Sequence, residues 1–184
     1  MSIIDQIDLM ARGGTLALLG LWGWVMVREH SATRVARAAL LMVMTIACHV
    51  IADLFPLMPL SGPALFLLKT GQSSAPAAFW LFARALFDDE ARLSWRSWAV
   101  VLGAAAMGAL LLLLMLVQPE YRLAFDIGQR VMWFGFAAAG LFVAYRGRGD
   151  DLIEERRRLR LRFVVVVGLY TILIIASGLL GNID

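Results

Sequence analysis

WRSWAVVLGAAAMGALLLLLMLV, residues 95–117, is the most hydrophobic stretch of the 184-residue chain. No charged side chain occurs in it from Ala99 to Val117. A helix needs roughly 20 apolar residues to cross a hydrocarbon core of about 30 Å, because each residue adds about 1.5 Å along the helix axis. The stretch therefore predicts a transmembrane helix.

Five further apolar segments lie on either side of this stretch, at residues 9–27, 35–54, 60–87, 122–145 and 163–180. Hydrophobic residues make up 61% of the chain, and its mean hydropathy is +0.77. Soluble domains contain about 45–50% apolar residues. We therefore expect one all-α, polytopic transmembrane helix bundle of six spans over residues 1–184, without a soluble domain.

The segment at 60–87 is longer than one crossing requires and is interrupted near its middle. As one helix its 28 residues would extend about 40 Å. The interrupting residues are Gly71, Gln72, Ser73, Ser74 and Pro76. We expect this third span to be a kinked helix.

The basic residues are gathered in alternate gaps between the six segments. The gaps at 28–37, 84–96 and 146–162 hold 13 of the 17 Lys and Arg residues. Cytoplasmic loops carry such an excess, so these gaps are expected to face the cytoplasm and the N-terminus the outside of a bacterial inner membrane. The net charge of +3 then belongs to these loops, and anionic lipids are its expected partner.

Six crossings that start outside return the chain to the outside at Asp184. A seventh span after this residue would bring a following domain into the cytoplasm. We therefore expect the six spans to be part of a seven-span domain. The alternative is a bundle of six spans alone.

Polar and ionisable side chains near the outer ends of three spans form a candidate ligand-binding site. Ionisable residues inside a membrane are energetically costly, so each suggests a function. We predict a polar cavity, open to the outer side and lined by His49, Asp53, Lys69, Asp126, Gln129 and Arg130. The alternative is that Asp53–Lys69 and Asp126–Arg130 are ion pairs that only hold helices in register, since long basic side chains can extend to the headgroups.

The sequence carries no signature of an enzyme, a metal site or a cofactor site. Metalloprotease, serine-hydrolase and phosphate-loop patterns are absent. A zinc site needs at least three protein ligands, and His30 is the only histidine besides His49. His49 is also a candidate proton sensor. The single cysteine, Cys48, excludes an internal disulfide and is expected to be a structural thiol.

Two cytoplasmic loops carry more specific patterns. FWLFARALFDDEARL, residues 79–93, places an acidic pair directly after a helix end, where it opposes the helix dipole and requires a basic partner. GRGDDLIEERRRLRLR, residues 147–162, has acids before bases, as at the start of a helix. A solvated, lipid-anchoring helix is one interpretation. The functional one is signal coupling through Arg84, Asp88, Asp89, Asp150, Asp151, Arg156, Arg157 and Arg158.

These two motifs, the second extended to GRGDDLIEERRRLRLRFVVVVGLY at 147–170, resemble the membrane-embedded N-terminal domain of a bacterial subclass of AraC-type transcriptional regulators. The resemblance is close over residues 76–93 and 145–170, whereas the other spans match only in hydropathy and order. It implies a multi-span sensor region that precedes a cytoplasmic helix-turn-helix domain. That domain is absent from this chain, so DNA is an expected partner only through it.

The leading hypothesis is a signal-sensing membrane domain of a one-component transcriptional regulator. A small-molecule ligand or a change in the membrane would shift the bundle, and a homodimer is expected because dimers usually read palindromic operators. The alternatives are a small transporter or channel subunit and a structural subunit of a membrane complex. The uncharged stretches at 99–117 and 163–180 do not favour a permeation path.

Overall fold

The computed structural model describes residues 3–30, 33–52, 54, 62–88, 93–118, 120 and 122–146, and in addition Arg158, Arg162 and Val166. Across these residues the regular structure is helical, and they contain no β-strand. Most of the predicted span at 163–180 lies outside the described residues.

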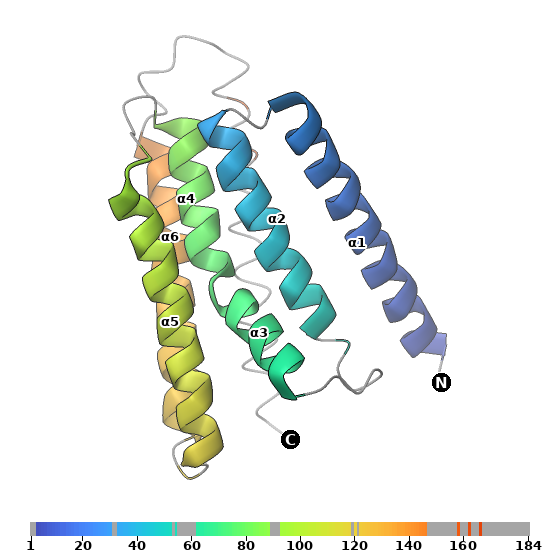
Figure 1. Ribbon diagram of the computed structural model, residues 1–184, viewed down its shortest axis with the longest axis vertical. Coiled ribbons are helices and arrows are strands. Elements are labelled where there is room, and N and C mark those ends of the chain that lie inside the picture. Colours follow the sequence, from blue (N-terminus) through green and yellow to red (C-terminus); the bar gives the residue numbers. More distant parts are fainter. Residues whose placement is uncertain are drawn as a thin grey trace.

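The described helices run up and down a bundle, with α3 and α4 following each other in the same direction (Figure 1). Their bounds are Ile3–His30 for α1, Arg34–Ala52 for α2, Gly62–Ser73 for α3, Ala75–Phe87 for α4, Trp95–Val117 for α5 and Arg122–Arg146 for α6. We call the end at which α1, α4 and α6 end the arginine-rich end. It holds Arg28, Arg34, Arg37, Arg84, Arg96 and Arg146.

Four of these helices are long and apolar enough to cross a membrane: α1, α2, α5 and α6. The bounds of α5 equal the predicted 95–117, and α2 and α6 lie within two residues of prediction. The α1 helix begins six residues before the predicted 9–27 and ends three residues after it. For the described residues the prediction of an all-helical structure with several helices apolar enough to cross a membrane is therefore confirmed, whereas α4, with 13 residues, is too short to qualify on its own.

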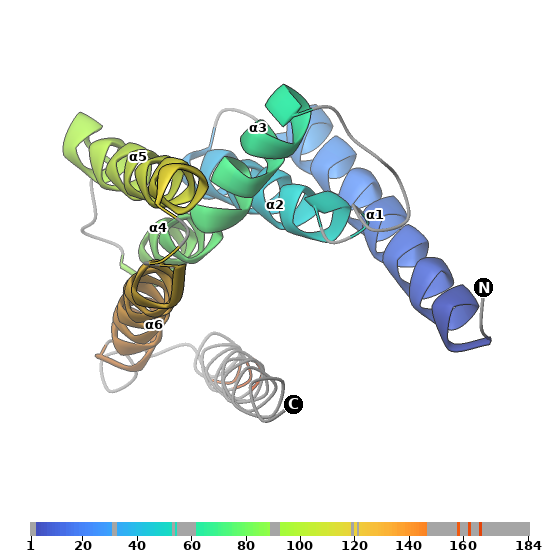
Figure 2. The same ribbon diagram turned by 90° about the horizontal axis from the view of Figure 1, so that it is seen from below.

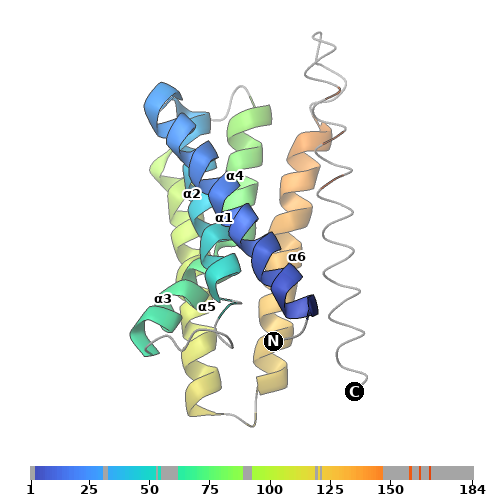
Figure 3. The ribbon, with the colours of Figure 1, turned by 90° about the vertical axis from the view of Figure 1, so that its right-hand side faces the viewer.

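The predicted third span is divided into α3 and α4 at Ser74, and Figure 3 shows α3 inclined to α4. Pro76 has no backbone N–H, so it cannot donate the helical hydrogen bond to the carbonyl of Gln72. The hydroxyls of Ser73 and Ser74 donate instead to the carbonyls of Thr70 and Gly71, over 2.7 and 2.8 Å. Such side-chain bonds compete with the helical pattern and bend helices. The interruption therefore follows from the local sequence.

The α4 helix lies at the centre of the bundle, between α2, α5 and α6 (Figure 2). Five of its 13 residues are alanine, and such small side chains allow helix backbones to approach closely. Its buried residues are Ala77, Ala78, Leu81, Phe82, Ala83, Ala85 and Phe87. They pack against Ala38 and Ala39 of α2, Val101 and Ala104 of α5, and Ala144 of α6. The core is thus built mainly from alanine.

The α1 helix lies on the outside of α2 and leans away from the other helices towards its N-terminus (Figure 2). Its C-terminal half packs more closely, since Gly23 faces Val43 and Trp22 meets the ring of Phe82 edge-on with centroids 6.4 Å apart. Most of its other large apolar side chains are exposed.

Candidate functional site

The most polar part of the bundle interior is the junction of α3 and α4, which we call the polar joint. It consists of residues 70–74: Thr70, Gly71, Gln72, Ser73 and Ser74. Gln72, Ser73 and Ser74 are buried. The 13 residues of α4 separate this joint from the arginine-rich end by about 20 Å, so it lies deep within the bundle.

A side-chain hydrogen bond connects the polar joint to α2. The amide nitrogen of Gln72 lies 2.7 Å from Nδ1 of His49, which is in the last turn of α2. An amide N–H that donates to Nδ1 requires that this nitrogen carries no proton, which corresponds to a neutral imidazole with its proton on Nε2. The contact joins α2 to α3, and which of the two groups donates depends on the tautomer of the imidazole.

A second contact connects the polar joint to α6. The indole N–H of Trp133 donates to the backbone carbonyl of Ser73 over 3.2 Å. Ser73 ends α3, and carbonyls at a helix end lack their usual intrahelical donors, so the indole supplies one. On the α5 side the joint is tightly enclosed, because a Cβ on Gly108 would overlap Oγ and Cβ of Ser73.

One hydroxyl of the polar joint has no partner. Oγ1 of Thr70 is buried and makes no hydrogen bond. A buried polar group without a partner costs about 1–3 kcal/mol. Gly71 is close to α2 as well, since a Cβ at this position would lie 2.7 Å from Sγ of Cys48. Cys48 therefore packs against the backbone of α3.

The structure describes five of the six candidate ligand residues and places them in different surroundings. His49 contacts the polar joint, and Lys69 directly precedes it on α3 and is half-buried. Asp126 and Arg130 pair with each other along α6 over 2.8 Å, with side chains 41% and 48% exposed, and Gln129 is half-buried on the same helix. Asp53 lies outside the described residues. Among the described candidates, His49 forms a hydrogen bond to another helix, through Gln72 of α3.

Sequence reasoning treated Gln72 and Ser73 only as an interruption and did not select Trp133. An available signal was the run of three polar residues inside an apolar span, because polar groups buried in lipid or protein require partners. Trp133 had no such signal. Its role depends on α6 lying beside the joint.

At the arginine-rich end, the candidate coupling residues of α4 contact each other. The guanidinium of Arg84 lies 3.9 Å from the carboxylate of Asp88 and 5.2 Å from the centroid of the Trp80 ring. The backbone N–H of Asp88 donates to the carbonyl of Arg84 and ends the helix. Arg84 is thus the basic partner that the acidic helix end requires.

The other candidate coupling residues are mostly not described. Arg158 is helical and exposed. Outside the described residues lie Asp89, Asp150, Asp151, Arg156 and Arg157.

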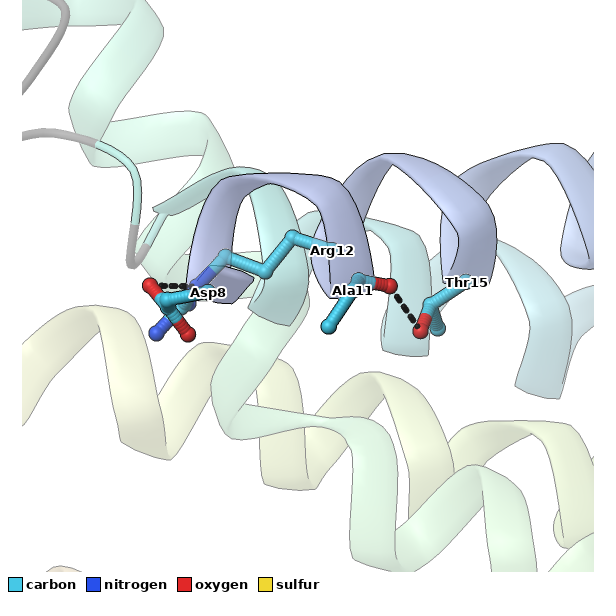
Figure 4. Close-up of polar contacts among 4 residues, drawn as sticks. All are labelled: Asp8, Ala11, Arg12 and Thr15. Carbon is cyan, nitrogen blue, oxygen red and sulfur yellow. Dashed lines mark hydrogen bonds and ion pairs between the residues drawn. The ribbon is translucent and has the colours of Figure 1, made fainter. Parts of the chain in front are cut away.

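Two further ion pairs have the same spacing as Arg84–Asp88 and serve as references for it. Arg12 pairs with Asp8 on α1 over 2.7 Å, and Thr15 donates to the carbonyl of Ala11 one turn further on (Figure 4). Like Asp126–Arg130, the α1 pair lies at the end of the bundle opposite the arginine-rich end. Exposed pairs of this kind contribute about 0–1 kcal/mol, so they secure a helix turn rather than a site.

Across the described ranges, no three His, Cys, Asp or Glu side chains are grouped so that they could hold a metal ion. The joint presents hydroxyl, amide, imidazole and indole groups, all of which can take part in hydrogen bonds. No family model, curated protein or solved structure matches this chain.

Proposed function

We propose that this chain is a signal-sensing membrane domain of a one-component transcriptional regulator in the bacterial inner membrane. The observation that carries the proposal is the position of α4. This helix begins at the polar joint, ends at Arg84 and Asp88, and is surrounded by α2, α5 and α6. It connects a polar interior region to a charged end.

The packing of α4 suits it to transmit a displacement. Closely packed cores shift between discrete arrangements instead of deforming continuously. A rearrangement at Ser74 would therefore move α4 as a unit and change the position of Arg84 and Asp88, about 20 Å away. The cytoplasmic loops, with Asp89, Asp150, Asp151, Arg156, Arg157 and Arg158, would pass the change on.

In this proposal the arginine-rich end faces the cytoplasm, α3 and α4 form one kinked crossing, and the chain makes six crossings of a seven-span domain. Anionic lipids neutralise the basic end. The stimulus is a small polar ligand near His49 and Lys69, or a change in the membrane itself. It must favour one of two bundle arrangements, since a stimulus that acts equally on both changes nothing.

The proposal assigns DNA binding to a separate cytoplasmic domain and expects the regulator to act as a homodimer. Two features support it: the motifs at 79–93 and 147–170, which resemble those of membrane-embedded AraC-type regulators, and the charged end of α4.

The test compares transcripts in cells that carry the wild-type gene or single-residue variants of it. Asp88→Asn removes the ion pair with Arg84 at the coupling end and is expected to alter a small group of transcripts, as deletion of the gene does. Asp8→Asn removes an ion pair of the same spacing on α1 and should leave these transcripts unchanged. If deletion of the gene changes no transcript, the chain does not belong to a transcriptional regulator.

The topology is tested separately with a reporter fused after Asp184 in a bacterial inner membrane. A periplasmic signal is expected from six crossings that start outside. A cytoplasmic signal would show that the crossing count is odd, and the interruption at Ser74 would be the first place to revise.

A small transporter is the second candidate, and the interruption between α3 and α4 favours it. Broken helices with polar junctions near the middle of the membrane bind substrates in several transporter folds. This candidate predicts flux of a small polar solute into liposomes that contain the purified chain. Flux together with unchanged transcripts would replace the sensor by the transporter.

A further inference from the structure

The contacts of α3 are concentrated at its C-terminal end. Gly71 packs on Cys48, Gln72 bonds to His49, and Ser73 faces Gly108. The opposite end is open, because Gly62 and Pro63 are exposed and Leu67 is 69% exposed. The helix packs along α2 and α5, and its tightest contacts lie in its last turn, next to the break at Ser74.

The break at Ser74 has the chemistry of a hinge. Pro76 removes the helical hydrogen bond that would connect it to the carbonyl of Gln72. The hydroxyls of Ser73 and Ser74 bond to carbonyls within the same turn, which keeps these polar groups paired if the helix direction changes. On the other side α4 is fixed by seven buried side chains. Rotation at this point therefore changes the angle between α3 and α4.

We propose that α3 is a pivoting arm, held in its present position by a clasp between Gln72 of α3 and His49 of α2. The clasp is a hydrogen bond of 2.7 Å between an amide and an imidazole. In an apolar interior such a bond is either made or broken, because a partly broken bond leaves two unpaired polar groups. The arm therefore has two discrete positions.

The second contact of the joint determines which part moves. The indole of Trp133 holds the carbonyl of Ser73 from α6. The two partners of the joint thus lie on different helices, α2 and α6, both of which pack against α4. Release of the Gln72 clasp frees the α2 side while Trp133 retains the hinge. This proposed movement of α3 does not depend on whether the chain is a sensor or a transporter.

The test measures distances between spin labels in purified full chain in lipid nanodiscs. Cys48→Ala removes the native thiol, and labels are attached at Leu67→Cys on α3 and Leu102→Cys on α5, both of which are 69% exposed in the wild type. A second pair, Leu102→Cys and Phe142→Cys, connects α5 to α6 and does not involve α3.

Gln72→Ala is expected to shift the ratio of two α3 positions roughly tenfold, the effect of one lost buried hydrogen bond. The exchange of the two residues, Gln72→His with His49→Gln, should restore the parent distribution because it restores an amide–imidazole bond. Thr45→Val is the matched control. It removes a buried hydroxyl of α2 that bonds only within that helix, to the carbonyl of Met42, and should change neither distance.

An unchanged α3 distance in Gln72→Ala overturns the proposal. So does an equal change in Thr45→Val, or a broadening of the α5–α6 pair, since both would indicate general loosening. If Gln72→Ala does not fold, His49→Ala removes the same bond from the uninterrupted α2 helix. Failure of both to fold would show that the bond supports the whole bundle and does not control an arm.

Discussion

The helices α4 and α5 show that the more hydrophobic helix is not the more deeply buried one. The α5 helix is the most hydrophobic segment, yet Leu102 and Leu116 are each 69% exposed. The α4 helix has 13 residues, many of them alanine, and is the most deeply buried. In a membrane the lipid is as apolar as leucine, so hydrophobicity does not draw helices together.

Small side chains determine the position of α4 instead. They let neighbouring backbones approach, and residues of neighbouring helices lie close to two glycines, Ser73 against Gly108 of α5 and Phe79 against Gly140 of α6. A long leucine-rich helix therefore identifies a surface exposed to lipid. A short helix of alanines next to a polar break identifies the centre of the bundle. Four substitutions test this contrast, in order of decreasing expected effect.

Leu81→Ala on α4 is expected to have the largest effect, a loss of about 3 kcal/mol in the free energy of unfolding, because Leu81 is fully buried and a cavity would remain. Thermal unfolding in detergent micelles measures the loss. Leu116→Ala on α5 removes the same atoms from an exposed position and should change stability by less than about 1 kcal/mol. Equal losses would show that α5 contributes to the core as much as α4.

Gly108→Ala is expected to destabilise the bundle by about 2 kcal/mol, because the new Cβ overlaps Ser73 and the neighbour must move. On the same helix nothing lies within 4 Å of a Cβ at Gly103. Gly103→Ala should therefore stabilise α5 by up to about 1 kcal/mol through helix propensity. Effects of the same sign on the melting temperature would contradict the close approach of α3 and α5.

Thr70→Val is expected to raise stability by about 1 kcal/mol, because it removes a buried hydroxyl that has no partner and preserves the shape of the side chain. Thr45→Val is the control, since its hydroxyl donates to the carbonyl of Met42 over 3.0 Å. Loss of the Thr45 hydroxyl should therefore not raise the stability of the protein. A lower melting temperature for Thr70→Val would indicate that its hydroxyl bonds to water or to another group in the membrane.

Asp126→Asn should have the smallest effect, below about 0.5 kcal/mol, because the pair with Arg130 is nearly half exposed and is screened by solvent and headgroups. The measurement is the melting temperature at low and high salt. A large change would place this pair in a buried polar cavity, as the prediction of a common ligand site requires.

Much of the helical architecture followed from the pattern of apolar residues. The bounds of α5 were predicted to the residue, and the interruption of the third span was located at the residues where α3 ends and α4 begins. Both are local properties, since lipid exposure requires a continuous apolar run and Pro76 lacks an N–H group. The predicted cavity of six residues depended on contacts between helices, and α2 and α3 had to be placed side by side before His49 could be assigned to Gln72.

Sequence alone determined that the chain forms helices long and apolar enough to cross a membrane and where its arginines gather, because length, hydropathy and charge act residue by residue. Tertiary structure decided which helix lies at the centre and which polar groups meet. Trp133 and Ser73 are 60 positions apart, and His49 and Gln72 are 23 apart. Such contacts depend on how the backbones of α2, α3 and α6 approach one another, which no local pattern specifies.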